Sequence, residues 1–134
     1  MKSRTVLPAV YNESSYGKYL TVSDVENVTG LQGVTRKEIA LTMEFYNEAD
    51  EKILEACFNS PNFYKNEVEK NQAYYVEISG IGQRAALAIP GTPYRITFLQ
   101  GKFCVMVQTP LEGGKTILKI TQMIEICKII AGRL

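Results

Sequence analysis

The chain has 134 residues, with 15 lysines and arginines against 14 aspartates and glutamates, and no histidine. This length fits a single domain, and a formal net charge of +1 argues against nucleic acid as a partner. The absence of histidine excludes a Ser-His-Asp triad, a Cys-His nucleophile pair and an HExxH zinc site.

The three cysteines, Cys57, Cys104 and Cys127, show neither CxxC nor any other metal-ligand spacing. We therefore expect reduced, buried thiols, no metal and no cofactor. No stretch reaches the roughly 18 apolar residues of a membrane span, so none is expected. The localisation stays open: the chain as it stands indicates a cytoplasmic protein, whereas a trimmed signal peptide would make it an exported one.

The N-terminal part predicts an extended arm over residues 1–19, because it lacks a sustained periodicity. A single domain is expected to follow over residues 20–134. Its first helix is short, since Thr21 can cap it and Gly30 supplies a stop. Asp24 in the first turn favours the positive end of that helix.

The residues from Val34 to Tyr46 alternate between apolar and polar side chains, which predicts one continuous strand. Residues 47–50 are a plausible turn, and residues 51–59 form the expected return strand. Pairing across this turn predicts three apolar pairs on one face: Ile39 with Phe58, Leu41 with Ala56, and Met43 with Leu54.

The next segment opens on Ser60-Pro61, a typical helix start, and the helix is expected to run to about Lys70. A strand follows over residues 74–79, and then three more strands joined by turns at residues 90–93 and at Gln100-Gly101. The registers across these turns predict two apolar rows: Leu87, Ile96 and Val105, and Ala85, Phe98 and Phe103.

The last helix is expected from about Thr121 to Gly132 and carries a wide apolar stripe. The element order is then α-β-β-α-β-β-β-β-α. This order predicts an α+β fold in which about six antiparallel strands form one sheet, with the helices packed mainly on one face.

The segment from Gly80 to Ala85 fits the GxGxxA fingerprint of dinucleotide-binding proteins. That motif needs a helix after it, so that phosphate can lie at the helix N-terminus. Residues 84–89 alternate as a strand instead. We therefore interpret the glycines as a bend between antiparallel strands.

The second face of the sheet, opposite the core, is more apolar than a solvent-facing antiparallel sheet. Its register places Cys104 opposite Thr97. Three interpretations stay open: cover by the N-terminal arm or a loop, an interface with another protein or a second copy, and a small-ligand or anion site. The candidate ligand or interface residues are Arg84, Ala86, Arg95, Thr97, Leu99, Cys104 and Met106.

Three short blocks carry a resemblance: residues 20–30 (LTVSDVENVTG), 79–82 (SGIG) and 131–134 (AGRL). They resemble a group of small uncharacterised prokaryotic domains that open with a Leu-Thr-x-x-Asp-Val helix and carry a Gly-Leu-Gly-Asp-x-Ala turn. Many of these domains sit behind lipoprotein or secretion signals, which would imply export. The chain departs from the group at Gln83, where the group has Asp, and in lacking that signal. The resemblance carries over no catalytic residue.

We expect a non-enzymatic binding or interaction domain that associates with a second copy or another protein through the second face. The alternative is a small-molecule or anion-binding domain, with weak enzymatic chemistry at most, that uses Arg84, Arg95 and Cys104. Arginine pairs bind carboxylate or phosphate, and a nearby arginine lowers the pKa of a cysteine thiol.

Overall fold

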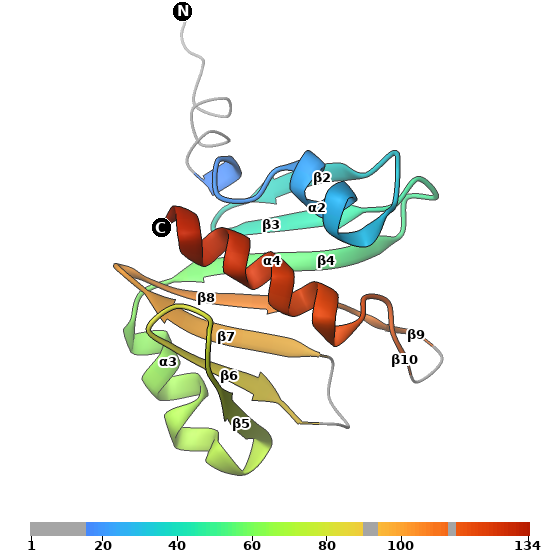
Figure 1. Ribbon diagram of the computed structural model, residues 1–134. Helices are drawn as coiled ribbons and strands as arrows, with labels where there is room; N and C mark the ends of the chain where they lie inside the picture. Colours follow the sequence, from blue (N-terminus) through green and yellow to red (C-terminus); the bar gives the residue numbers. More distant parts are fainter. Residues whose placement is uncertain (1–15, 90–93, 113–114) are drawn as a thin grey trace, which may run out of the picture.

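The computed structural model describes residues 16–89, 94–112 and 115–134. It is an α+β fold built on one antiparallel sheet of seven strands (Figure 1). The turn expected at residues 90–93, and the first 15 residues of the expected arm, lie outside the described residues. In their order across the sheet the strands are β2 (Thr35–Ile39), β3 (Thr42–Tyr46), β4 (Lys52–Asn59), β8 (Phe103–Gln108), β7 (Arg95–Gln100), β6 (Arg84–Ala88) and β5 (Tyr75–Ile78).

Two helices, α2 (Val22–Thr29) and α4 (Ile120–Arg133), lie on one face of this sheet (Figure 1). The helix α4 packs against β7 and β8, as its wide apolar stripe predicts. Two further short strands, β9 (Leu111–Glu112) and β10 (Lys115–Thr116), pair with each other. The core between sheet and helices contains Phe45, Leu54, Phe58, Ile96, Phe98, Val105, Met123 and Ile126.

The helix α2 begins and ends where the sequence predicts. The amide of Thr21 donates to Asp24 Oδ2 at 2.8 Å, and the amide of Asp24 donates to Thr21 Oγ1 at 3.1 Å. This reciprocal pair satisfies two amides that the first helical turn leaves without partners. Gly30 ends the helix with φ of 78°, in the left-handed region that glycine adopts readily.

Asp24 also joins α2 to α4, because Arg133 Nη1 and Nη2 lie 2.5 and 3.0 Å from its carboxylate oxygens. The hydrogen bond from Arg133 lowers the pKa of Asp24 from 3.8 to about 2. A carboxyl whose pKa is lower in the folded protein than in the unfolded chain stabilises the fold at pH values above the pKa of the unfolded chain. That contribution is lost as the pH falls through the pKa of the folded protein.

We therefore expect Arg133→Met to lower the free energy of unfolding by about 1 kcal/mol at pH 7, since Arg133 is partly exposed. The loss should shrink as the pH falls from about 4 towards 2, where Asp24 takes up a proton. Urea unfolding of both proteins between pH 7 and pH 3 measures it. An equal loss at every pH would contradict the assignment of the pair.

The strand expected from Val34 to Tyr46 is wrong, because the chain reverses at Ala40 and Leu41 to make the β2–β3 hairpin. Ala40 has φ of 54°, a conformation that alanine rarely adopts. The alternating pattern does not mark the turn, since both strands of a hairpin share the period of two. The sheet therefore has seven strands where about six were expected.

Several predicted cross-strand pairs are also wrong, most of them by two residues, although the Leu87–Ile96 and Ala85–Phe98 pairs are confirmed. A displacement of two residues leaves a side chain on the same face of the sheet. The division between the core face and the second face therefore survives in β3 and in β6 to β8. It is wrong at the β2–β3 turn, because Ile39 and Leu41, expected on the same face as Met43, are 58% and 46% exposed. The structure pairs Ile39 with Thr42, Met43 with Ala56, Phe45 with Leu54, Ile96 with Val107, Phe98 with Val105, Leu99 with Cys104, and Thr97 with Met106.

The helices were expected mainly on one face, and α2 and α4 share one, but a further helical segment lies on the other face. The helix α3 (Asn62–Glu67) and the 3-10 helix η1 (Glu69–Tyr74) pack against the second face, over the half of the sheet that contains β5 to β8 (Figure 1). The apolar stripe of a helix predicts that one side is buried, but not which face of a sheet buries it.

Candidate functional site

The apolar half of the second face is covered by α3 and η1. Tyr64 and Val68 pack there against Ala86 and Cys104, in a small cluster separate from the main core. Phe63 adds to this contact from the partly buried edge of the cluster. The sequence left open whether the N-terminal arm or a loop, a protein partner or a ligand covers this face. In the structure the chain's own helical segment, α3 and η1, covers this half of it.

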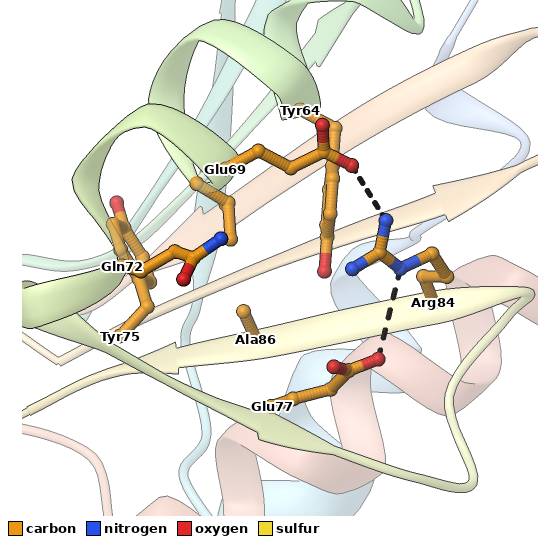
Figure 2. Close-up of a pocket in the computed structure, with 8 residues that line it drawn as sticks. Tyr64, Glu69, Gln72, Tyr75, Glu77, Arg84 and Ala86 are labelled. Atoms are coloured by element: carbon orange, nitrogen blue, oxygen red, sulfur yellow. Dashed lines mark hydrogen bonds and ion pairs between the residues drawn. The ribbon is translucent and has the colours of Figure 1, made fainter.

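A pocket of about 270 Å³ remains between this helical segment and strands β5 and β6 (Figure 2). The side chains of Glu69 and Gln72 reach into it from η1, and those of Glu77 and Arg84 reach into it from the strands. The full lining is Tyr64, Val68, Glu69, Gln72, Tyr75, Glu77, Arg84 and Ala86.

Arg84 is the centre of charge in this pocket. Its Nη1 lies 2.6 Å from Glu69 Oε2, and its Nε lies 3.6 Å from Glu77 Oε2. Its guanidinium also lies 5.0 Å from the centroid of the Tyr64 ring, a distance at which a cation is attracted to a ring face. One positive charge therefore stands between two negative ones, and the hydrogen bond to Glu69 raises the pKa of Arg84 further.

The hydroxyl of Tyr64 is buried and has no hydrogen-bond partner within residues 16–89, 94–112 and 115–134. The whole side chain is 1% exposed. Figure 2 shows this hydroxyl at the inner end of the ring, pointing into the space between Arg84 and Ala86. Burial raises the pKa of Tyr64, so the hydroxyl keeps its proton and can donate a hydrogen bond as well as accept one.

The structure brings two of the seven predicted residues, Arg84 and Ala86, into the pocket. Thr97 and Cys104 are fully buried on the second face, and Leu99 packs partly buried against the small cluster under α3. None of these three lines the pocket.

The two remaining predicted residues lie outside the pocket as well. Arg95 Nη1 lies 3.1 Å from Glu67 Oε2, and its Nε donates to Gln108 Oε1 at 3.0 Å. Met106, opposite Thr97, is half-buried. The two arginines thus belong to separate ion pairs and do not form one anion site.

Sequence reasoning missed the residues that the helical segment contributes to the pocket. Tyr64 and Val68 belong to the helical segment that was predicted to start at Ser60-Pro61, but its packing against the second face was not predicted. Tyr75 and Glu77 alternate on one face of their strand, which is the signal that could have placed them beside Ala86. Glu69 and Gln72 carry no comparable signal, because their position depends on the 3-10 segment.

Cys104 does not have the environment of a nucleophile. Burial raises the pKa of its thiol to about 12. We expect iodoacetamide at neutral pH to modify the half-buried Cys57 first and to leave Cys104 unmodified in the folded protein. Peptide mass spectrometry after timed labelling measures both sites. Labelling of Cys104 as fast as a free model thiol would contradict the burial and revive the nucleophile hypothesis.

Other classes of site find no support in the described part of the chain. It contains no group of three or more His, Cys, Asp or Glu side chains placed to hold a metal ion. Its helices are all too short or too polar to cross a membrane. A second hollow, of about 430 Å³ between α2 and α4, has a single charged lining residue, Glu125.

The pocket under α3 and η1, which combines charged and polar side chains, is therefore the candidate functional site. The comparisons with protein-family models, curated proteins and solved structures found no match.

Proposed function

We propose that this chain is a non-enzymatic binding domain that holds a small polar ligand in the pocket around Arg84. The observation that carries the proposal is the buried Tyr64 hydroxyl, which faces the pocket without a partner in the described residues. Leaving such a group unpaired costs roughly 1–3 kcal/mol. A ligand atom that forms a hydrogen bond with the hydroxyl removes this cost, so the empty pocket favours a polar ligand.

Three expectations from the sequence receive less support. Self-association through the second face needs its apolar residues to be accessible, whereas α3 and η1 cover Ala86 and Cys104. An anion site shared by both arginines needs them side by side, whereas Arg84 pairs with Glu69 and Arg95 with Glu67. Catalysis by Cys104 is disfavoured by the raised pKa of its thiol. Binding of a small polar molecule is the function that fits these contacts.

The proposal is tested by Tyr64→Phe, which removes the hydroxyl and keeps the ring. We expect this change to raise the free energy of unfolding by about 1 kcal/mol, because the buried hydroxyl makes no hydrogen bond, while weakening ligand binding. Thr97→Val is the matched control. Thr97 Oγ1 is likewise buried without a partner in the described chain, but Thr97 does not line the pocket. It should add similar stability and leave binding unchanged.

Thermal unfolding of the three proteins with glucose, inorganic phosphate, uracil or L-alanine measures both effects. At least one probe should raise the Tm of the unmodified chain and of Thr97→Val by about 2 °C or more, and should not raise the Tm of Tyr64→Phe. The proposal fails if no probe raises the Tm of the unmodified chain, or if Tyr64→Phe responds as fully as Thr97→Val.

A further inference from the structure

The polar groups of the pocket form two subsites, or seats: one offers hydrogen-bond donors and the other offers a carboxylate. The first is a pair of donors: the Tyr64 hydroxyl, which has no partner in the described residues, and the guanidinium nitrogen Nη2 of Arg84, which takes part in neither the ion pair to Glu69 nor the one to Glu77. Figure 2 shows this nitrogen, without a dashed line, on the side of the guanidinium that faces the Tyr64 hydroxyl. Two donors that face one space suit an oxyanion, and a carboxylate accepts from both at once.

The second seat is the carboxylate of Glu77. Its side chain is 65% exposed, and its oxygen lies 3.6 Å from Arg84 Nε, so the pair is loose. Glu69 lies only 2.6 Å from Arg84 Nη1 and holds the arginine in place. Glu77 can therefore take a positively charged ligand group without releasing Arg84 from its main partner.

The charges favour a ligand that carries both signs. A ligand with only a carboxylate would meet two glutamates, and a ligand with only an amine would meet the guanidinium of Arg84. Like charges at close range repel, so each of these ligands gains at one seat and loses at the other. A zwitterion with adjacent carboxylate and ammonium groups gains at both.

The size and walls of the pocket limit the rest of the ligand. A volume of about 270 Å³ lies below the usual range for drug-sized ligands, so the guest is small. Val68, Ala86 and the ring of Tyr75 supply apolar surface beside the polar groups. A short aliphatic side chain fits this lining.

From these contacts we propose that the pocket binds a free α-amino acid with a small side chain. The carboxylate lies between Arg84 and the Tyr64 hydroxyl, and the ammonium group lies at Glu77. This inference rests on the proposed function, because it names the ligand class of the same pocket.

Isothermal titration of the full chain with L-alanine, propionate and ethylamine tests the inference. Propionate is alanine without the ammonium group, and ethylamine is alanine without the carboxylate. We expect L-alanine to bind at least about tenfold more tightly than either, since each analogue loses a charge-assisted contact of more than 1.4 kcal/mol, the equivalent of a factor of ten. Equal affinity for propionate or ethylamine would overturn the inference.

The Glu77→Gln variant separates the two seats, and Glu112→Gln, an exposed glutamate on β9, is its matched control. Glu77→Gln should weaken L-alanine about tenfold and leave propionate no weaker, while Glu112→Gln changes neither. Unchanged L-alanine affinity in Glu77→Gln would overturn the ammonium seat. If glucose, phosphate or uracil binds in a Tyr64-dependent way and L-alanine does not, the inference fails and the proposed function stands. If none of the probes binds, both fail.

Discussion

Replacing Phe58 by alanine is expected to lower the free energy of unfolding by about 3–5 kcal/mol, the usual range for a buried phenylalanine. Phe58 is 1% exposed and lies in β4 at the centre of an aromatic cluster. Its ring centroid lies 4.9 Å from that of Tyr16, 5.7 Å from that of Tyr19 and 5.8 Å from that of Phe103. Such ring pairs add about 0.5–1.5 kcal/mol beyond the burial of apolar area.

Urea unfolding followed by far-UV circular dichroism measures this effect, because the chain has no tryptophan for fluorescence. Leu111→Ala is the control, since Leu111 is 42% exposed on β9 and should change the stability by less than about 0.5 kcal/mol. A loss below about 1 kcal/mol for Phe58→Ala would show that the packing of Tyr16 and Tyr19 on Phe58 does not stabilise the fold.

Gly82→Ala is expected to lower the free energy of unfolding by about 2–4 kcal/mol, the sum of a backbone and a steric effect. Gly82 has φ of 57°, in the left-handed region that disfavours residues with a Cβ atom. A Cβ atom at this position would lie 2.5 Å from the backbone oxygen of Leu99. That oxygen accepts the amide of Gln83 at 2.7 Å, so it cannot move away without breaking the turn.

Gly80→Ala separates the two effects within the same bend. Gly80 also has positive φ, 93°, but a Cβ atom there meets nothing within 4 Å. It should lose only the backbone contribution, about 1–2 kcal/mol, in the same urea measurement. If both variants lost the same amount, the close approach of Gly82 to β7 would have no energetic consequence.

The sequence predicted those parts of the fold that local chemistry determines. Thr21, Asp24 and Gly30 limit α2 by hydrogen bonds and backbone conformation within the helix itself. The two faces of β6 to β8 were also predicted, because register errors of two residues leave each side chain on its face. Such predictions need only the period of the pattern and the chemistry of neighbouring residues.

The remaining features depend on contacts between distant residues. Ala40 is held in the left-handed region by the hairpin around it, and alanine gives no signal for such a turn. The placement of α3 on the second face depends on how Tyr64 and Val68 fit Ala86 and Cys104, which periodicity does not determine.

The candidate site could be predicted from the sequence only in its strand residues. Arg84 and Ala86 were found because they alternate on the second face of a predictable strand. The hydroxyl of Tyr64 and the carboxylate of Glu69 were not, because both belong to the helical segment that crosses that face. A pocket between a helix and a sheet becomes visible only when their packing is known.

A ¹H–¹⁵N NMR titration shows where on the protein a ligand binds, and so tests whether the pocket under α3 and η1 is a ligand site. The full chain is titrated with whichever probe of the panel stabilises it most. We expect amide shift changes centred on Gln72, Glu77 and Arg84 that are lost in Tyr64→Phe and kept in Thr97→Val. Shift changes centred on the hollow between α2 and α4, around Asn27 and Gln122, would contradict it, as would the absence of any change.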